Sequence, residues 1–461
     1  MLNTPSSGSH EPYLADGTPL AALIDHDRRE VAQRLFSDPE IYQWELKNIW
    51  AKSWIIVGHE SEIPNPGDFV TRRIAEDPVI VTRRPDGSID CVLNVCPHRG
   101  ALVCREEAGN SPVFRCIYHG WIFNTDGSFR GAPFKEEMYP EGMDAKRLSL
   151  PKARVGIFGG IIFANWDESA PSLDDYLGDY KFYLNLIFNR TANGVEVLGP
   201  PQRFVINANW KTASEQFGGD AYHAGQLHRS LGALTGGSPN NPRDWQLHAP
   251  KVSTANGHNI ICFDLGDMFR AMTGGKELSS MEKLHMLPPA GLPPEMLPEM
   301  LQRFSEEELE LLATTPPSNG GMFPNAGVWS MYNPMYNGMP APFLSFRTYV
   351  PIGPDKFEFY MWVLVAKGAS EEYRDLMRRS TSFMQGAAGF IEGDDAEVWP
   401  GQTSAARGYV TRQQTLKYWA MTGDTKPESW PGEGQVHVGF SRDDPQWNWW
   451  KVYFDRLEAK V

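Results

Sequence analysis

Two short segments of the sequence each combine a cysteine with a histidine. The first is Cys96-Pro97-His98, and the second, after 17 intervening residues, is Cys116-Ile117-Tyr118-His119-Gly120-Trp121. Thiolate and imidazole both bind metals, so the four side chains could hold one metal centre between two loops. A zinc finger groups its cysteines on one element and its histidines on another, whereas each segment here is mixed. The mixture favours iron–sulfur chemistry over a zinc finger.

This division of ligands is typical of a Rieske [2Fe–2S] cluster, in which two thiolates bind one iron and two neutral imidazoles bind the other. Neutral ligands lower the negative charge on the cluster and raise its reduction potential, so it accepts electrons from a low-potential donor. The remaining cysteines, Cys91, Cys104 and Cys262, have no such partner. We expect them to be buried as small apolar residues.

A second group of metal-binding residue types is formed by Asp220, His223 and His228. Histidines five residues apart do not share a face of a regular α-helix, so we expect the backbone to bulge if both bind one metal. Asp220 lies three residues before His223 and could orient its imidazole through a hydrogen bond. Two histidines and one carboxylate form the triad that holds non-haem Fe(II) with open positions for O₂.

The carboxylate of such a triad must come from elsewhere in the chain. The acidic segment Glu392-Gly393-Asp394-Asp395-Ala396-Glu397 follows a predicted helix and is the best candidate. Its alternative interpretation is a solvated acidic helix end. A Rieske cluster in the same chain favours the metal site, because a one-electron carrier needs an acceptor.

The elements that must position these residues fall into three parts. Residues 1–53 are expected to form a loose arm and a helical lead-in that belongs to the catalytic domain, with Ser37 and Asp38 as an N-cap pair. Residues 54–166 contain short β-branched and aromatic runs with hairpin turns at 85–87 and 124–127, which predicts a small all-β Rieske domain. Residues 167–461 are expected to form the mononuclear iron domain.

The fold class that these patterns predict is α+β, with the small all-β domain inserted in a domain built on a large antiparallel sheet with covering helices, a helix-grip-like arrangement. Helices are expected at about 173–188, 306–312 and 371–389, and strands at 194–206, 258–264, 344–349 and 357–365. The segment Met286–Pro324 is rich in Pro, Met and Leu, and we expect an irregular lid or connector there.

Composition excludes several classes of protein. The 461 residues include 43 Lys+Arg and 57 Asp+Glu, a net charge of −14, which argues against nucleic acid or an anionic membrane as a partner. The longest apolar run, Val155–Ala164, is far shorter than the ~20 residues that span a bilayer, and the N-terminus does not resemble a secretory signal. Five cysteines argue against a disulfide framework. We expect a cytoplasmic protein.

Taken together, these motifs resemble the large (α) subunit of Rieske non-haem iron ring-hydroxylating oxygenases, the group of naphthalene and biphenyl dioxygenases. The shared motifs are Cys-x-His, Cys-x-x-His-Gly-Trp, Asn-Trp-Lys at 209–211, Asp-x-Tyr-His-x₄-His and the late Gly-Phe-x-Glu-x-Asp-Asp, in the family's order. The resemblance implies one [2Fe–2S] cluster and one mononuclear Fe²⁺ per chain. By position it implies the following ligands: Cys96 and Cys116 on one cluster iron, His98 and His119 on the other, and His223, His228 and Asp395, with Asp394 as the fallback, on the mononuclear iron.

The resemblance also assigns roles to residues around the iron. Asp220 matches the aspartate that, in trimers of this family, joins the iron site of one subunit to a Rieske histidine, here His119, of its neighbour. Gln216 stands where many of these dioxygenases have Asn, close to the iron. Positional matching implies substrate-pocket residues, for which plain core packing is the alternative: Gln216, Phe217, Ala224, Leu227, Gln385 and Ile391.

A separate electron donor is expected. The chain has no Gly-rich dinucleotide fingerprint and no four-cysteine ferredoxin spacing, so it cannot take electrons from NAD(P)H itself. We expect a reductase, with or without a ferredoxin, to reduce the cluster, and the product to be a cis-dihydrodiol of an aromatic ring. The resemblance favours an α₃β₃ assembly with a small β subunit over an α₃ homotrimer.

Three alternatives remain open at this stage. A monooxygenase or demethylase could use the same scaffold, for instance on an aromatic acid bound by Arg229 or Arg378, although solvated surface charges are the better interpretation of both arginines. A pure electron carrier would use only the cluster. A zinc-stabilised interaction protein would use neither iron centre and would be colourless.

Overall fold

The computed structural model describes residues 12–230, 249–333 and 340–458. The N-terminal part contains short elements: η1 (Leu20–Leu23), β1 (Ile24–Asp25), β2 (Glu30–Ala32), η2 (Gln33–Phe36), α1 (Pro39–Glu45) and the π-helical turn η3 (Leu46–Trp50). Asp38 caps α1, since its side chain accepts the backbone N–H of Glu40. The helical expectation for this part is wrong at β2, because β2 pairs with the distant strand β21 (Thr415–Lys417). A local pattern contains no information about that pairing.

The next region is almost entirely β structure. Its main sheet has seven strands in the order β3-β12-β11-β6-β5-β4-β7, and a three-stranded sheet, β10-β9-β8, lies beside it. The strands are β3 (Ile55–His59), β4 (Asp68–Ile74), β5 (Asp77–Arg83), β6 (Ile89–Leu93), β7 (Ala108–Asn110), β8 (Val113–Arg115), β9 (Ile122–Asn124), β10 (Phe129–Gly131), β11 (Lys152–Phe158) and β12 (Ile161–Asn165). Short helices η4 (Glu60–Glu62), α2 (Lys135–Met138) and α3 (Ala145–Leu148) complete it. Both predicted hairpin turns are confirmed, as the links β5–β6 and β9–β10.

The remainder is built on a nine-stranded antiparallel sheet. Its order is β13-β20-β19-β18-β17-β16-β15-β22, and β14 also pairs with β20. The strands are β13 (Val195–Val197), β14 (Gln202–Ile206), β15 (Lys251–Ser253), β16 (Asn259–Cys262), β17 (Pro317–Met322), β18 (Ala326–Asn333), β19 (Ala341–Gly353), β20 (Lys356–Ala366) and β22 (Gln435–His437). The mixed α+β architecture with a large antiparallel sheet is therefore confirmed.

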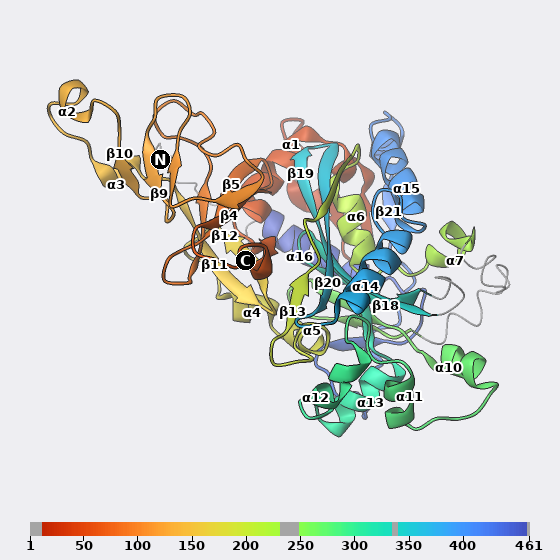
Figure 1. Cartoon of the computed structure of the whole chain (residues 1–461). Helices are drawn as coiled ribbons and strands as arrows, with labels where there is room; N and C mark the ends of the chain where they lie inside the picture. The colour runs from red at the N-terminus through yellow and green to blue at the C-terminus, as the bar shows by residue number, and fades with distance from the viewer. Residues whose placement is uncertain (1–11, 231–248, 334–339, 459–461) are drawn as a thin grey trace.

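Helices cover this sheet (Figure 1). The helices are α4 (Leu173–Leu177), α5 (Tyr180–Phe188), α6 (Trp210–Phe217), α7 (Ala224–Leu227), α10 (Gly266–Thr273), α11 (Ser280–Met286), η5 (Pro294–Met296), α12 (Leu297–Leu301), α13 (Glu306–Thr314), α14 (Glu371–Met384), α15 (Glu392–Ala405), η7 (Thr411–Gln413) and α16 (Asp444–Leu457). The single helix expected over 173–188 is divided by Gly178, whose φ of +48° interrupts the helix. Helix α14 packs on β19 and β20, while α6 lies against β17, β18 and β19.

The segment Met286–Pro324 is not irregular, which corrects the sequence-based expectation. It contains η5, α12, α13 and β17. Ser305 and Glu308 form a capping box at the start of α13, and a proline occupies an early position of α12. Its Leu and Met side chains form a core of their own with Leu186 and Ala366. The prolines therefore begin helices rather than prevent them.

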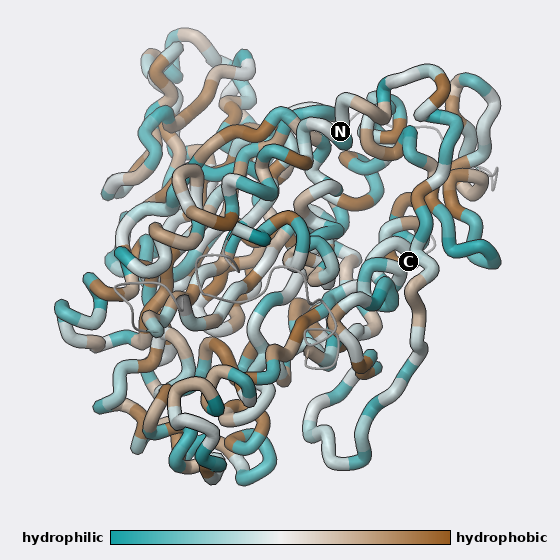
Figure 2. Tube along the Cα trace, turned by 90° about the vertical axis from the view of Figure 1, so that its right-hand side faces the viewer, coloured by the Kyte–Doolittle hydropathy of each residue, from teal (hydrophilic) through white to brown (hydrophobic). Residues whose placement is uncertain are grey.

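The hydrophobic interior joins the parts of the chain. One core combines the N-terminal segment, β3–β6 and β12 with α6, α15 and α16. Figure 2 shows that the outermost loops are largely hydrophilic. Glu45 of α1 is fully buried and accepts hydrogen bonds from Lys211 Nζ (2.5 Å) and Trp210 Nε1 (2.8 Å). The Asn-Trp-Lys motif thus fixes the start of α6, the helix that leads to the histidines.

The three cysteines outside the two Cys-His segments differ in burial. Cys91 and Cys262 are buried as expected, whereas Cys104 is only half-buried, because its loop lies at the surface beside Glu106. Among the described residues, no helix combines the length and hydrophobicity needed to cross a bilayer.

Candidate metal centres

The two Cys-His segments form turns with the same hydrogen-bond pattern. Cys96 donates its backbone N–H to Ala101, five residues on, and its carbonyl accepts from Gly100. Cys116 likewise donates to Trp121 and accepts from Gly120. Both glycines have φ near +70° (74° and 71°), a conformation that favours glycine. The two turns therefore place their cysteines in equivalent positions. Their histidines differ by one position, since His98 is the third residue of its turn and His119 is the fourth.

The side chains of the two turns converge. The Nδ1 atoms of His98 and His119 lie 3.1 Å apart, and the His98 ring stacks on Trp121 at a centroid distance of 4.6 Å. Cys96 and Cys116 are buried, and their thiols lie in hydrogen-bond contact. Burial and the neighbouring Cys116 thiol raise the pKa of Cys96.

This donor set fits a Rieske cluster. Two buried thiols face the interior, and two imidazole nitrogens face each other nearer to the surface, so one iron would be buried and the other near solvent. Burial and the neighbouring His119 lower the pKa of His98, which keeps its imidazole neutral, the form that binds metal. His119 is exposed, as are Ile117 and Tyr118 beside it.

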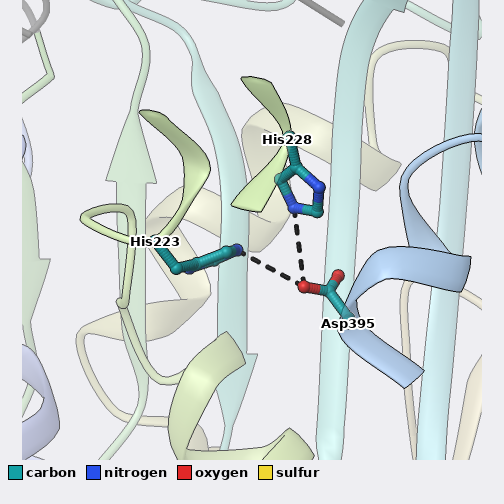
Figure 3. Close-up of side chains that lie close together, drawn as sticks. All are labelled: His223, His228 and Asp395. Carbon is teal, nitrogen blue, oxygen red and sulfur yellow. Dashed lines mark ion pairs between the residues drawn. The ribbon is translucent and has the colours of Figure 1, made fainter. Parts of the chain in front are cut away.

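The second centre is assembled from α7 and α15. His223 immediately precedes the single turn α7 (Ala224–Leu227), and His228 immediately follows it. Asp395 comes from the first turn of α15. Its Oδ1 lies 3.6 Å from His223 Nε2 and 3.5 Å from His228 Nε2 (Figure 3). The expected bulge in a longer helix is wrong, because the chain leaves the helical path before His223 and the two histidines bracket a separate short turn.

The geometry fits a divalent metal ion. One ligand atom from each of His223, His228 and Asp395 lies within 4.8 Å of the others. Ligands of an octahedral ion at about 2.1 Å lie roughly 3 Å apart in adjacent positions, so a small contraction would close the triad around one ion. In Figure 3, His223 and His228 point from different directions to the same oxygen of Asp395. Three ligands leave the other positions of a six-coordinate ion open.

Burial controls the protonation of this group. It raises the pKa of Asp395 to about 7, with His223 opposing the shift. It also lowers the pKa of His228 to about 4, assisted by the charge of His223. A cation in the site would reverse the shift of Asp395 and favour the neutral imidazole of His228. The electrostatics therefore favour a cation among these three side chains.

Asp394 and Asp395 contact different atoms of the same histidine. Asp395 faces His228 Nε2, whereas Asp394 Oδ2 lies 3.1 Å from His228 Nδ1. Asp395 is buried, while Asp394 is half-buried. A carboxylate on the outer nitrogen fixes the tautomer and orientation of a metal-binding imidazole. No sequence pattern indicated this position of Asp394, which was expected only as a substitute for Asp395 as the metal ligand.

Asp220 holds the other histidine. Its Oδ2 lies 3.3 Å from His223 Nδ1, and its Oδ1 accepts the backbone N–H groups of Tyr222 and His223. Burial would raise the pKa of Asp220, but the hydrogen bond and charge of His223 outweigh it, so the pKa is lowered. Gly219 precedes it with φ of +135°, and a Cβ there would lie 2.6 Å from Pro445 Cβ. The turn that presents Asp220 therefore requires glycine.

Gln216 lies at the centre of the site. Its Nε2 donates to Asp395 Oδ1 at 2.9 Å and lies 3.4 Å from His223 Nε2. Its Oε1 accepts from Trp399 Nε1 at 2.8 Å. Trp399 has no motif signal of its own, but its spacing of four residues from Asp395 places both side chains on one face of α15.

The other residues that resemblance implied for the substrate pocket have varied surroundings, and their pocket role stays a prediction. Ala224 and Leu227 lie on α7 between the histidines and are half-buried. Phe217 is buried, with Tyr349 and the Arg347 guanidinium 5.6 Å and 4.7 Å from its ring centroid. Ile391 packs with Phe343 and Met384.

Gln385 belongs to a buried polar network. Its Oε1 accepts from Ser345 Oγ (2.5 Å) and Arg347 Nη2 (2.6 Å). Arg347 also donates to both carboxylate oxygens of Glu392, at 2.7 and 2.9 Å. Glu392 begins α15, so this network anchors the turn that presents Asp395.

Comparison with known proteins places both centres in one family. Residues 53–148 match the Rieske [2Fe-2S] domain, and residues 173–418 match the ring hydroxylating alpha subunit (catalytic domain). The chain is 32% identical over 439 residues to the N,N-dimethyl phenylurea N-demethylase subunit alpha of Sphingobium sp. (strain YBL2), covering 94% of this chain and 93% of that protein. It is 35% identical over 413 residues to a benzene 1,2-dioxygenase subunit alpha of Pseudomonas putida, covering 88% and 86%.

The structural comparison agrees. Naphthalene 1,2-dioxygenase from Rhodococcus sp., solved with bound indole, superposes with a TM-score of 0.82 at 33% identity, covering 94% of this chain and 95% of that one. The protein belongs to the ring-hydroxylating alpha subunits, with a Rieske [2Fe–2S] domain and a catalytic domain of the type that binds mononuclear iron. It is an oxidoreductase that incorporates O₂ and depends on electron-transfer partners.

Proposed function

We propose that this chain is the terminal oxygenase alpha subunit of a multicomponent dioxygenase that cis-dihydroxylates a ring of a monocyclic or polycyclic aromatic substrate. The observation that carries the proposal is the convergence of His223, His228 and Asp395 in a chain that also has a Rieske domain. The reaction adds both atoms of O₂ to two adjacent ring carbons and consumes two electrons and two protons. NAD(P)H supplies the electrons through the partner proteins.

The proposed ligands follow the geometry. Cys96 and Cys116 would bind the buried cluster iron, and His98 and His119 the outer one. His223, His228 and Asp395 would hold the mononuclear iron, with Asp395 preferred over Asp394 because it faces Nε2 of both histidines. Iron in this site would supply the activation of O₂ with electrons from the cluster.

The chain's own residues then have distinct tasks. Asp220 and Asp394 hold the outer nitrogens of His223 and His228, so that both Nε2 atoms point to one place. The Arg347–Glu392 pair anchors the first turn of α15. Phe217, Ala224, Leu227, Gln385 and Ile391 stay our candidates for shaping the substrate pocket, together with Gln216.

Electron delivery is proposed to cross between subunits. In Figure 1, β9, which follows one Rieske turn, and β10 lie on the opposite side of the molecule from α7 and α15. His119 is exposed, and Asp220 is partly exposed, with 27% of its side chain accessible. We infer a trimer in which His119 of one subunit approaches Asp220 of the next, with a small β subunit completing an α₃β₃ assembly.

The domain boundaries and the location of the protein in the cell are also proposals. We retain the division into 1–53, 54–166 and 167–461. It is supported by the pairing of β3 with β12, which joins the first and last strands of the middle part, and by the bonds of Glu45 to α6. We infer a cytoplasmic location, supported by five cysteines that form no disulfide.

N-demethylation is the second candidate, favoured by the 32% identity with the phenylurea N-demethylase subunit over 94% of the chain. The two reactions differ in the fate of oxygen. A dioxygenase places two labelled atoms from ¹⁸O₂ in one diol, whereas a demethylase releases labelled formaldehyde.

The test is turnover of the purified oxygenase with a reductase and ferredoxin, offering naphthalene, biphenyl and a dimethyl phenylurea under ¹⁸O₂. A doubly labelled cis-dihydrodiol would support the proposal. Formaldehyde without diol would establish the second candidate. If the cluster is reduced but no substrate class gives a product and no O₂ is taken up, the result would favour the alternative that the protein is an electron carrier.

A further inference from the structure

The Gln216 side chain contacts two groups of opposite hydrogen-bonding character. Asp395 Oδ1, when ionised, is only an acceptor, and Trp399 Nε1–H is only a donor. Gln216 Nε2 lies 2.9 Å from the carboxylate oxygen, and Gln216 Oε1 lies 2.8 Å from the indole nitrogen. A flipped amide would place an oxygen against the carboxylate and an NH₂ against the indole N–H. The two partners therefore fix the orientation of the amide.

The carboxylate oxygen that Gln216 contacts is the one that faces the histidines. Asp395 Oδ1 lies 3.6 and 3.5 Å from the Nε2 atoms of His223 and His228, and Gln216 Nε2 lies 3.4 Å from His223 Nε2. The amide nitrogen thus occupies a position beside the place where the three ligand atoms converge. If the amide turned over, its carbonyl oxygen would occupy that position.

An amide carbonyl oxygen is a competent ligand for a divalent ion, whereas an amide NH₂ is not. The orientation of Gln216 therefore decides how many ligands the protein offers. Trp399 is fully buried on the same face of α15 as Asp395, so its indole N–H has no access to water as an alternative partner. Its hydrogen bond retains the Gln216 oxygen on the side away from the histidines.

We propose that Gln216 and Trp399 form a positioning pair that keeps the metal site at three protein ligands. Gln216 holds Asp395 through the oxygen that faces both histidines, and Trp399 prevents the Gln216 carbonyl from becoming a fourth ligand. The open positions for O₂ are thereby preserved. This inference rests on the proposed iron site.

The test uses the full-length protein with its cluster intact and Fe(II) restored anaerobically, and nitric oxide as the probe of an open position. Trp399→Phe keeps an aromatic ring and removes only the donor. We expect its iron to bind nitric oxide about tenfold more weakly, measured by the EPR signal of the complex. The double variant Trp399→Phe/Gln216→Leu has no carbonyl to turn and should return to within about twofold of wild type. Effects of this size are typical of groups that orient metal ligands.

Gln216→Leu alone gives a second and different readout. It removes the donor to Asp395, so Fe(II) affinity should fall about tenfold, while nitric oxide binding per bound iron stays unchanged. The matched control is Trp362→Phe, a fully buried tryptophan on β20 that stacks on Phe346 and Tyr360. It should change neither affinity.

Several results would overturn the inference. These are wild-type nitric oxide affinity in Trp399→Phe, a double variant as weak as Trp399→Phe, or wild-type Fe(II) affinity in Gln216→Leu. Failure of the proposed function is distinguishable, because then His228→Ala would bind as much Fe(II) as the wild type.

Discussion

The two candidate centres are built in opposite ways. The proposed Rieske ligands come from two turns between residues 96 and 119, and His119 is exposed there together with Ile117 and Tyr118. The proposed mononuclear ligands are spread from position 223 to position 395, and they lie at the two ends of α7 and in the first turn of α15, with Asp395 buried. A centre that exchanges electrons with partners benefits from the surface, whereas one that handles O₂ benefits from exclusion of bulk water.

The largest expected effect is loss of the Rieske cluster while the mononuclear iron site is retained. Cys116→Ser removes one cluster ligand, so colour, acid-labile sulfide and turnover should disappear, while Fe(II) binding at the histidines persists because no residue of that site is altered. Metal analysis and the optical spectrum measure this. The control is Cys104→Ser, a half-buried cysteine outside the ligand set, which should keep its colour. Loss of Fe(II) binding in Cys116→Ser would show that the centres are not independent.

Asp220→Asn tests the connection between the centres. The amide retains an acceptor for the backbone N–H groups of Tyr222 and His223, but it loses the charge beside His223. Both centres should stay loaded, while oxidation of the prereduced cluster slows about 100-fold in single-turnover stopped flow. Asp443→Asn removes a neighbouring carboxylate outside the ligand set and serves as the control. An unaltered rate in Asp220→Asn would exclude this residue from the electron route.

The buried pair of Arg347 and Glu392 should stabilise the catalytic domain with its mononuclear iron site, but not the Rieske cluster. Arg347→Met leaves the Glu392 carboxylate unpaired in the interior, and breaking a buried ion pair costs about 3–5 kcal/mol. The denaturation midpoint of the catalytic domain should fall, with the cluster spectrum unchanged. Arg378→Met breaks an exposed pair with Glu371 and should cost about 1 kcal/mol or less. Equal losses in both variants would contradict the anchoring role of Arg347.

The smallest effect concerns the orientation of His228. Asp394→Asn replaces the carboxylate beside His228 Nδ1 with a neutral acceptor, so Fe(II) affinity should fall about tenfold. Glu397→Gln, an exposed change on the same helix, is the control for charge alone. Equilibrium Fe(II) titration compares them. A greater loss, with no iron bound at all, would indicate that Asp394 rather than Asp395 is the ligand.

The same contrast explains how far the sequence could predict the structure. The Rieske turns were readable because each carries its ligands and its glycine within six residues. The carboxylate of the second centre could not be identified in this way, since neither spacing nor periodicity connects Asp395 with His223. Only the resemblance to the family indicated Asp395 as the ligand. The structure places Asp395 between the histidines and Asp394 outside them, but no sequence pattern indicated that Trp399 would orient Gln216.

The errors in the fold have the same origin. Strand β2 lies in a segment with helical spacing and forms because β21, almost 400 residues away, pairs with it. The Pro-rich segment 286–324 was expected to be irregular, although its capping box at Ser305 and Glu308 is a local helix signal that could have been recognised. A local pattern cannot indicate a long-range pairing such as that of β2 with β21. The capping box is itself a local pattern and could have been recognised.

The most direct test of the central claim is a count of iron and acid-labile sulfide per chain in the wild type and in His228→Ala, after anaerobic purification and Fe(II) reconstitution. Two centres predict about three irons and two sulfides in the wild type, and about two of each in the variant with its Rieske EPR signal intact. Three irons in His228→Ala, or zinc and no colour in the wild type, would contradict the account.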